Sequence, residues 1–398
     1  MLNKNGIREL AYVVKIDDIQ PIIGSDNCEA AIVGGWKVMV RKETFKPGDL
    51  AVYFEIDSKV PETETFEFLE KKHYKIKTQK YTFGGANKEG FYSQGLLMHF
   101  NDFGWEKDAH KEGDFLTEEL GVTYAEPEDN KRKSSGSDKY KKMAARHPKL
   151  FQNPIIKKIY KNKTGKKILF FFFGKKQDKL DFPSWVIKTD EERIQNLQHM
   201  IPEFRKEKWI ATEKIDGTST TFTLHKRGHK KFEYAVCSRN VRMTEFKNGG
   251  YYENNVYTEM STKYSMKNVL LDMLNRAPKC DYVTIQGETY GEGIQKRNYN
   301  IKEHNLVVFN VIFGKDDGLI LRLNPLKMKE LMDCYNIPTV PIIAEDIELP
   351  ETCDEILAMA HGKSQFDDDL REGIVFRNYD ATKSFKAVDN EFLLKYHG

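Results

Sequence analysis

The stretch KWIATEKIDGTSTTFTL, residues 208–224, constrains the fold of this chain more than any other. An apolar-leaning run, residues 208–213, precedes Lys-Ile-Asp-Gly, and a second run rich in Thr and Phe follows. A strand that stops at Asp-Gly and then resumes is typical of a hairpin. On an extended strand, Lys214 and Asp216 project from the same face. The segment therefore predicts two strands with a charged pair where they meet.

A lysine at this place favours a chemical role. A lysine amine attacks phosphorus or carbon only when it is neutral, whereas its usual pKa is about 10.4. Nearby cations, including a metal ion, and partial desolvation lower the pKa of such an amine. Gly217 has no side chain, so a nucleotide could approach the backbone closely. Lys214 is therefore a candidate nucleophile beside a phosphate and a metal ion.

The pattern Lys-x-Asp-Gly is weak evidence alone, because chance produces it in roughly one chain in ten. This chain contains it twice, and the second copy, residues 315–318, lies between the runs LVVFNVIF and LILRL. There the Asp-Gly pair predicts a hairpin turn, and Lys315 is expected in solvent. What distinguishes the two copies is the sequence that follows each of them.

Residues 1–125 have the pattern of an all-β domain. Apolar residues alternate in WKVMVRK and in LAVYFEI, on either side of a turn signal at residues 46–49. A further strand candidate, SQGLLMHF, follows a glycine-rich stretch. Short strands with such turns between them predict a small barrel or sandwich.

Residues 126–181 change from a linker-like run to a basic, partly helical stretch. Between residues 131 and 179 there are 17 Lys and Arg against two acids, a net charge of +15, so the rest of the chain carries −12. This basic band attracts polyanions, nucleic acid first, although a solvated linker is the alternative. Its run ILFFFF, residues 168–173, is too short to cross a bilayer and is expected to be a buried strand or helix segment.

Residues 182–398 mix helices and strands, so the fold class is α+β. Helices are expected over KNVLLDMLNRA, over LKMKELMDCY and over TDEERIQNLQHMI, the last with Thr189 or Asp190 as N-cap. Strands are expected at 208–213, 219–225, 282–289, 305–313, 319–323, 372–377 and 384–388. The domains predicted are a front β domain (1–125), a basic linker (126–181) and a mixed domain (182–398).

The five cysteines are an odd number and include no C-x-x-C pair. They predict neither a zinc site nor a disulfide framework, and they fit the cytoplasm or another reducing compartment inside a cell. The N-terminus lacks the features of a signal peptide, so secretion is not expected. No membrane partner is expected either.

Five further motifs follow Lys214 along the chain. They are CSRN with Arg239, IQGETYG with Glu288, VVFNV with Phe309, REGIVFR with Glu372, and SFKAV with Lys386. Together the six resemble the motifs of the covalent nucleotidyltransferases, the superfamily of DNA ligases, RNA ligases and mRNA capping enzymes. Chance matches to all six, in this order and at strand ends, are very rare.

The resemblance implies a catalytic set and an ATP-binding set. The catalytic residues it implies are Lys214 as the nucleophile that carries AMP, Lys386, and Glu372 as the divalent-metal carboxylate. The ATP-binding residues it implies are Glu213, Asp216, Gly217, Arg239, Glu288, Phe309 and Lys386.

Each remaining role also follows from the resemblance. Phe309 is similar to the aromatic that stacks on adenine, with core packing as the alternative. Glu288 resembles the acceptor for the ribose hydroxyl, and Arg239 a donor to ribose or phosphate. Lys386 resembles the α-phosphate contact that stabilises charge building on phosphorus. For Glu372 the alternative is a surface charge.

Glu372 and Lys386 are expected to flank one hairpin, with its turn in NYDAT. If residue 374 pairs with residue 386, the even-numbered side chains of both strands share one face. Some RNA ligases have Lys-x-Lys in the last motif, where this chain has one lysine. A second could come from Lys383 or Lys395.

Three features narrow the resemblance to ATP-dependent RNA ligases. DNA ligases and capping enzymes usually carry Arg two residues after the motif glycine, where this chain has Ser219. Residues 387–398 are too few for the OB barrel that those enzymes place after the last motif. The β-rich front domain instead resembles the clade with an N-terminal OB-like β-barrel and a C-terminal nucleotidyltransferase domain of ATP-grasp-like antiparallel sheets with flanking helices.

In the front domain the likeness rests on FKPGDLAVYFEIDS, YKIKT and YSQGLLM. Before the nucleophile it rests on FPSWVIKTDEERIQN, residues 182–196. Lys188, Arg193 and Gln195 are therefore candidates for contacts to the triphosphate or the RNA end. A capped helix without such contacts is the alternative.

The function that the resemblance implies is RNA ligation in RNA repair. Lys214 would attack the α-phosphate of ATP, with Mg²⁺ or Mn²⁺ bound, and release pyrophosphate. AMP would pass to an RNA 5′-phosphate, and a 3′-hydroxyl would displace it. A nicked duplex or paired ends, with RNA on the 3′-hydroxyl side, is the expected substrate, held by the front barrel and the basic band. The enzyme is expected to be a monomer.

Two alternatives stay open. One is an ATP-dependent DNA ligase or a GTP-using capping-type nucleotidyltransferase. The other is a non-catalytic protein that binds RNA ends with the same fold. Retention of both Lys214 and Lys386 favours an enzyme.

Overall fold

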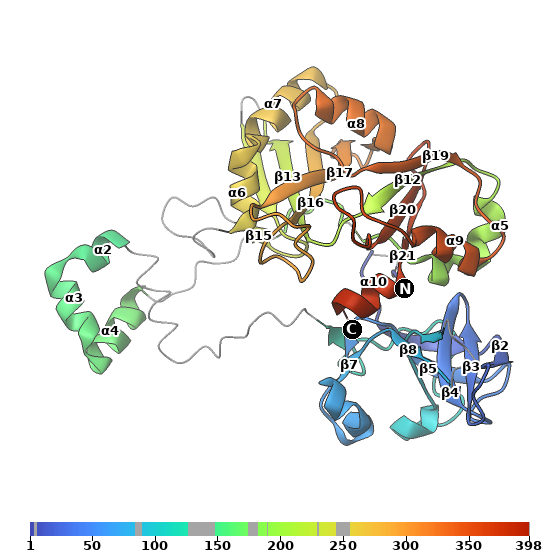
Figure 1. Ribbon diagram of the computed structural model, residues 1–398. Coiled ribbons are helices and arrows are strands. Elements are labelled where there is room, and N and C mark those ends of the chain that lie inside the picture. The colour runs from blue at the N-terminus through green and yellow to red at the C-terminus, as the bar shows by residue number, and fades with distance from the viewer. Residues whose placement is uncertain are drawn as a thin grey trace. The chain divides into compact units, whose positions relative to one another are not determined.

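The chain folds into two compact units, each assembled from separate stretches of sequence (Figure 1). The first consists of Met1–Pro127, Asp190–Asp216 and Val340–Gly398, and the second of Glu128–Thr189 and Gly217–Thr339. The computed structural model describes residues 1–3, 6–83, 90–125, 148–173, 182–188, 190–228, 231–243 and 255–397. The α+β fold class is confirmed, and the predicted domain boundaries stay predictions.

The front domain consists of short antiparallel sheets, as predicted. One sheet has the order β1 (Ala11–Lys15), β5 (Leu50–Phe54), β10 (Leu96–Met98), and a second has the order β2 (Asp18–Pro21), β3 (Cys28–Val33), β4 (Trp36–Arg41). The smaller sheets are β11 (Thr123–Tyr124), β6 (Ser58–Lys59) and β7 (Lys75–Ile76), and the pair β8 (Gln79–Tyr81) and β9 (Phe91–Ser93). Two 3-10 helices, η1 (Glu64–Lys72) and η2 (Phe100–Phe103), complete the described part of this domain.

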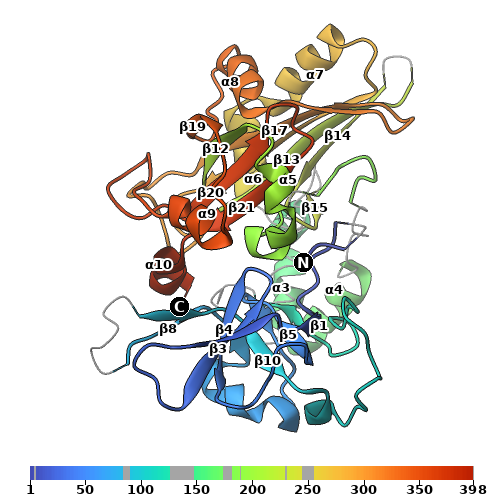
Figure 2. The ribbon, with the colours of Figure 1, turned by 90° about the vertical axis from the view of Figure 1, so that its right-hand side faces the viewer.

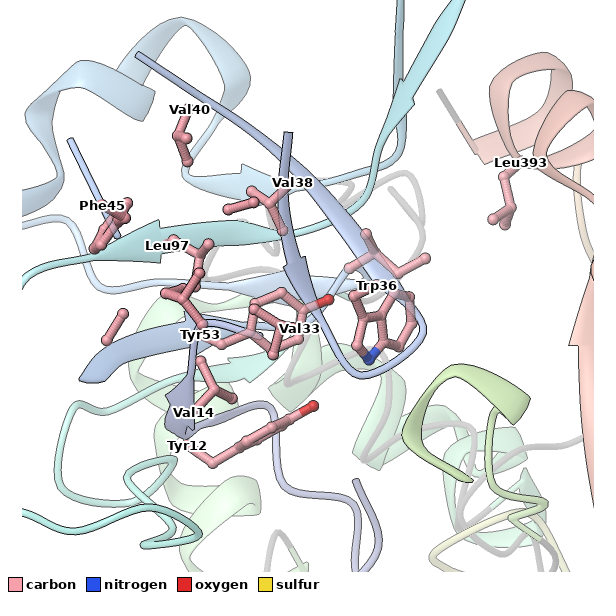
Figure 3. Packing of buried hydrophobic residues seen from close by; sticks show 14 of the residues in the cluster. Tyr12, Val14, Val33, Trp36, Val38, Val40, Phe45, Tyr53, Leu97 and Leu393 are labelled. Atoms are coloured by element: carbon pink, nitrogen blue, oxygen red, sulfur yellow. The ribbon is translucent and has the colours of Figure 1, made fainter. Parts of the chain in front are cut away.

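Strand β5 is buried on both of its faces. Ala51 and Tyr53 pack in a cluster with residues of β3 and β4. Figure 3 shows this cluster and labels Tyr53, Val33, Trp36 and Val38. Val52 and Phe54 pack in a second cluster with residues of η1 and η2. The alternation predicted for this strand would leave one face in solvent, but the second cluster covers that face. The strand is therefore fixed from two sides.

A buried carboxylate, Glu55, follows β5 directly. Its Oε2 accepts hydrogen bonds from Nε and Nη2 of Arg8 at 3.0 and 2.9 Å. Its Oε1 accepts from Tyr12 OH at 3.0 Å and from Nδ2 of Asn196 at 2.7 Å. Burial alone would raise the pKa of Glu55, but the Arg8 guanidinium and the hydrogen bonds lower it to about 2. Since Asn196 belongs to the segment before β12, this carboxylate ties the front domain to the rest of its unit.

We expect Glu55→Gln to lower the free energy of unfolding by about 3 kcal/mol, because it leaves the Arg8 guanidinium buried without its carboxylate. The folded-state pKa lies below the unfolded value of 4.5, so the stabilisation is present above pH 4.5 and is lost as the pH falls towards 2. Denaturant titration at pH 7 measures the change. The control Glu62→Gln, at an exposed partner of Lys59, should change it by less than about 0.5 kcal/mol. Equal stability of the two variants would contradict the assignment.

The first unit also contains a four-stranded antiparallel sheet (Figure 2). Its order is β19 (Ile342–Ile347), β12 (Trp209–Lys214), β20 (Gly373–Asn378), β21 (Ser384–Val388). Its helices are the 3-10 helix η3 (Ile194–Met200), α5 (Ile201–Phe204), α9 (Cys353–Ala360), α10 (Asn390–Phe392) and the π-helix η4 (Leu393–His397). Leu393 packs in the cluster of the front domain that contains Trp36, and Figure 3 labels both residues.

The second unit contains a six-stranded antiparallel sheet. Its order is β15 (Arg242–Met243), β14 (Phe232–Cys237), β13 (Thr218–Lys226), β16 (Tyr282–Tyr290), β17 (Asn305–Gly314), β18 (Ile320–Arg322). Its helices are α6 (Val256–Lys263), α7 (Met266–Arg276) and α8 (Pro325–Asp333), besides the three helices of the basic band. The predicted hairpin at Asp216-Gly217 is wrong, because β12 and β13 belong to different sheets.

The helix predicted from Thr189 or Asp190 begins later, at Ile194. Thr189 lies outside the described residues. The Glu192 carbonyl accepts a hydrogen bond from the Lys386 N–H at 2.8 Å, and the N-cap Arg193 is extended. Pairing with β21 therefore outweighs the helix signal of the acidic run.

The described part of the basic band forms three helices, α2 (Pro148–Gln152), α3 (Pro154–Lys161) and α4 (Lys163–Phe173). The remainder of the band, residues 131–147 and 174–179, lies outside the described residues. The prediction that ILFFFF is buried is wrong for Ile168, Phe171 and Phe172, which are exposed, whereas Leu169 is buried. None of the helices described is both long and apolar enough to span a membrane.

Candidate functional site

Strand β12 ends at Lys214 and lies between β19 and β20. Its pairing with β20 places Thr212 opposite Val375 and Lys214 opposite Gly373. The pairing of β20 with β21 places Val375 opposite Lys386. Opposed residues of antiparallel strands share a face, so Thr212, Lys214 and Lys386 lie on one face of the sheet.

The opposite face of this sheet is an apolar core. Its members from the three strands are Trp209, Ala211, Ile374, Phe376, Phe385 and Ala387. They pack with residues of η3, α5 and α9, and the rings of Phe376 and Phe385 stack with their centroids 4.9 Å apart. Alternation along β12 therefore anchors the strand on one side and presents Lys214 on the other.

The predicted register of the β20–β21 hairpin is wrong by one residue. Ile374 pairs with Ala387, and Val375 pairs with Lys386. In each pair, one residue number is even and the other is odd. The length of the turn sets this register, and the strand patterns alone do not reveal it. Glu372 directly precedes β20, so Glu372 and Lys386 do flank one hairpin, as predicted.

Lys214 and Glu372 form an ion pair, with Nζ 2.7 Å from Oε1. Burial raises the pKa of the Glu372 carboxyl; the Lys214 ammonium opposes this rise, and Asp216 adds to it. The second oxygen, Oε2, is buried and accepts no hydrogen bond within the described part of the chain. A buried carboxylate oxygen without a donor fits a ligand of a divalent cation.

Asp216, two residues beyond Lys214, is buried next to a histidine. Nε2 of His397 lies 3.6 Å from Oδ1 of Asp216. Burial lowers the pKa of His397, but the carboxylates of Asp216, Glu372 and Asp57 outweigh it, and the net change is a rise. This rise favours the protonated, positively charged form of His397 beside the acids of this site.

Lys386 is buried, and its Nζ lies 3.1 Å from Oδ1 of Asp190. Burial lowers the pKa of Lys386 to about 8; Asp190 opposes this change, whereas the cations Arg8, Arg193 and Lys214 add to it. Asp190 is therefore the acid that favours the charged form of this amine.

Arg193 and Gln195, the two candidates for end contacts in this unit, are both buried. Nη2 of Arg193 donates to Oδ2 of Asp57 at 2.8 Å. Its Nε and Nη1 are buried and have no acceptor within the described residues. The Gln195 carbonyl accepts from Gly35 N–H at 2.9 Å, and its Nε2 donates to Oε1 of Gln94 at 3.4 Å. Gln195 is thus bonded to residues of the front domain, whereas Arg193 keeps two N–H donors that a ligand could use.

The Glu213 side chain lies on the face opposite to Lys214. It is buried and accepts hydrogen bonds from Ser364 Oγ at 2.6 Å and from Gln365 N–H at 2.8 Å. Its backbone N–H donates to the Pro341 carbonyl at 2.9 Å. Glu213 thus holds β12 in place, and its predicted ATP contact stays a prediction.

The two candidates for a second motif lysine each have an acidic partner. Lys383 forms an ion pair with Glu207, which raises the pKa of Lys383. Nζ of Lys395 lies 2.7 Å from Oδ1 of Asp369, and this contact raises the pKa of Lys395. Neither contact involves Lys386.

In the second unit, Gly217 lies against strand β16. A Cβ at this position would lie 2.4 Å from the Thr289 carbonyl oxygen and 3.0 Å from Cγ of Glu288. Pairing of β13 with β16 places Ser219 opposite Glu288. The protein's own backbone therefore requires glycine here, whereas the sequence interpretation attributed it to a nucleotide. Close approach of a nucleotide stays a prediction.

Phe309 lies at a bulge in β17. Gln286 is opposite Asn310, whereas Gly287 is opposite Val308, so Phe309 is the extra residue. Its side chain is half-buried. Bulges redirect side chains, often next to functional sites.

Arg239 and Lys188 are exposed residues of the second unit. Arg239 lies in the turn between β14 and β15, which the Ser238 N–H closes by donating to the Val241 carbonyl at 2.9 Å. Nζ of Lys188 lies 5.9 Å from the ring centroid of Phe182. Their nucleotide and RNA contacts stay predictions.

Three residues of the first unit were missed by the sequence interpretation. The acidic run predicts Asp190 as a helix N-cap, although an acid near a basic motif is also a usable signal for an ion pair. Asp57 lies two residues after Glu55, beyond the end of β5, with a φ of 67°, a loop position where polar residues often have functions. His397 belongs to no motif, so the sequence contains no signal for it.

The face that carries the half-buried Lys214 and the buried Lys386 combines cations with acids. Cations in a partly buried site stabilise negative charge on a phosphate. No group of three or more His, Cys, Asp or Glu among the residues with described positions could hold a metal ion. A cation at Glu372 would therefore take its other ligands from water and phosphate oxygens, as Mg²⁺ commonly does.

Two family models match this chain. Residues 207–397 match the RNA ligase family, and residues 10–99 match an OB-fold domain. No curated protein sequence matches the chain.

Solved structures of Naegleria gruberi RNA ligase are similar to this chain along nearly its whole length. A mutant with ATP and Mn is 27% identical with a TM-score of 0.72, covering 98% of this chain and 100% of the other. The ligase with PPi is 28% identical with a TM-score of 0.73, covering 98% and 99%. A further mutant, with AMP and Mn, is 29% identical with a TM-score of 0.72, covering 98% and 99%.

Proposed function

Because this chain belongs to the RNA ligase family and has an N-terminal OB-fold domain, we propose that it seals RNA ends in three ATP-dependent steps. The observation that carries this proposal is the sheet face where Lys214 and Lys386 lie together, with Glu372 bonded to Lys214. A nucleophilic amine, a cation for the phosphate and a carboxylate for the metal are the groups that lysine adenylylation needs.

In the first step, Nζ of Lys214 attacks the α-phosphorus of ATP, and pyrophosphate leaves. The ion pair with Glu372 favours the ammonium form of Lys214, so the proton must be lost before attack. A divalent cation at the buried Oε2 of Glu372 would supply positive charge that favours the neutral amine. Lys386, held by Asp190, stabilises the charge that develops on the α-phosphate oxygens. The unused donors of Arg193 suit the leaving pyrophosphate or the RNA end.

In the second step, an oxygen of the RNA 5′-phosphate attacks the adenylyl phosphorus, and the Lys214 amine leaves. In the third step, the RNA 3′-hydroxyl attacks the activated 5′-phosphorus, and AMP leaves with the bonding electrons. Phe309, Glu288 and Arg239 would bind adenine, ribose and phosphate, with further contacts from Gly217, Asp216 and Glu213. Lys188 and the basic band would contact the RNA.

The relatives support the choice of nucleotide and metal. Structures of the Naegleria gruberi ligase contain ATP and Mn or AMP and Mn, and we infer ATP with Mg²⁺ or Mn²⁺ for this chain. A monomer without zinc, sealing nicked or paired ends during RNA repair, completes the proposal. All five cysteines are free thiols, which suits a reducing compartment.

The deciding experiment is incubation of the protein with α-labelled ATP and magnesium, followed by a nicked duplex. We expect label on the protein from ATP and sealing where the 3′-hydroxyl strand is RNA. Label from GTP alone would favour a capping-type enzyme, and equal sealing of an all-DNA nick would favour a DNA ligase. Tight binding of nicked RNA without any label would favour the non-catalytic alternative.

A further inference from the structure

The three helices of residues 148–173, here called the helical module, form a small packed body (Figure 1). A Cβ on Gly165 of α4 would lie 2.0 Å from the Ile159 carbonyl oxygen, so α3 and α4 approach closely. The rings of Phe151 and Tyr160 meet edge to face with centroids 5.1 Å apart, and Leu169 is buried. The module lies between the ranges that match the OB-fold and RNA ligase models, so neither model explains it.

The module leaves several large apolar side chains exposed. On α4, Ile168, Phe171 and Phe172 are 51%, 76% and 66% exposed. Their spacing of three and four residues places them in one stripe along the helix. On α3, Ile155 and Ile159 form a second stripe and are 69% and 38% exposed. Exposed apolar side chains that gather in this way mark an interaction surface.

The polar residues of the module give this surface a strong positive charge. Residues 148–173 contain seven lysines and neither Asp nor Glu. Lys167 lies one turn before Phe171, and Lys158 is exposed on α3. A long lysine side chain can lie along apolar surface while its amine reaches the headgroup level of a membrane.

The composition of the stripes separates a lipid surface from RNA. Aromatic rings can stack on bases, but the aliphatic Ile155, Ile159 and Ile168 cannot, and they need an apolar environment. The ring of Tyr160 is already engaged, because it packs on Phe151 and Lys166 Nζ lies 5.2 Å from its centroid. An apolar environment next to negative charge is what an anionic bilayer surface provides.

We propose that the helical module binds the surface of anionic lipid membranes, with Ile168, Phe171 and Phe172 at the acyl boundary and lysines at the headgroups. With 11 residues, α4 can lie in the interface but cannot cross the bilayer. This departs from the expectation that the chain has no membrane partner. The proposal does not depend on ligase activity.

Flotation of the full-length protein with vesicles tests the proposal. We expect binding to phosphatidylcholine vesicles that contain phosphatidylserine, and none to phosphatidylcholine alone. Phe171→Ser combined with Phe172→Ser should weaken binding by more than about tenfold. Lys158→Gln combined with Lys167→Gln should weaken it by about 25-fold, since each lysine near the surface strengthens binding by about fivefold. The control Phe232→Ser, at an exposed Phe of β14, should bind as wild type does.

Several outcomes would overturn the proposal. One is that the wild type does not bind the phosphatidylserine vesicles. Another is that both double variants bind these vesicles as strongly as the wild type. Loss of RNA affinity in the Phe double variant, with vesicle binding unchanged, would assign the surface to RNA. Self-association that the Phe double variant abolishes, without vesicle binding, would assign it to a second copy of the chain. Melting curves that match wild type show that each variant is folded.

Discussion

Lys214→Ala should take up no label from α-labelled ATP, a loss of more than about 10⁴-fold, because removal of a covalent nucleophile leaves no alternative route. Lys214→Arg should be equally inactive, since a guanidinium keeps its proton at any accessible pH and cannot attack phosphorus. The label is measured on the denatured protein, so that bound but unreacted ATP does not contribute.

The second Lys-x-Asp-Gly copy supplies a matched control within the same chain. Nζ of Lys315 lies 3.6 Å from Oδ2 of Asp317 in a surface turn, so Lys315→Ala should be labelled as wild type is. The third step needs no nucleophilic lysine, so Lys214→Ala should still seal a nick whose 5′-phosphate already carries AMP. Label that persists in Lys214→Ala would assign the nucleophile to another residue.

The sequence predicted the structure best in β12, where one face of the strand packs in the core and the other carries the candidate nucleophile. Trp209 and Ala211 alternate with Thr212 and Lys214, and the structure buries the first pair in the core and places the second on the other face. The strands around Glu372 and Lys386 were predicted close to their observed limits, because each is a short apolar run between polar turns. The motif order could therefore be assigned to strand ends before the structure was known.

Other features depend on contacts between distant segments. The register that opposes Val375 to Lys386 is set by the turn, and the acidic run before Arg193 is not helical because Glu192 bonds to β21. The sequence suggests close approach of a nucleotide at Gly217, and the structure adds a neighbour that no local pattern reveals, the Thr289 carbonyl of β16. No local pattern encodes such long-range pairings.

Some residues around the predicted site could not be identified from the sequence for the same reason. Asp57 comes from the barrel and His397 from the end of the described chain, and both act electrostatically on residues of the motifs. Sequence motifs identify groups that are close along the chain or known from a family. They do not identify the partners that folding brings beside them.

Lys386→Ala should lower kcat/KM for lysine adenylylation by about 10²- to 10³-fold, because it removes a buried cation from the developing charge on phosphate. Burial lowers the pKa of Lys386 to about 8, so its amine is charged below that pH and neutral above it. Since kcat/KM reports the free enzyme, its alkaline decline should begin near pH 8.

Lys386→Arg provides the sharper test of that pH dependence. A guanidinium stays charged through this range, so the variant should lack the decline near pH 8, whatever its absolute rate. Lys383→Ala removes a lysine of the same hairpin that is bonded to Glu207, and it should keep both the rate, within about twofold, and the decline. An identical alkaline decline in Lys386→Arg would mean that another group titrates there. The charge that stabilises the transition state would then have to come from elsewhere, and Arg193, with two donors that have no acceptor among the described residues, is a candidate.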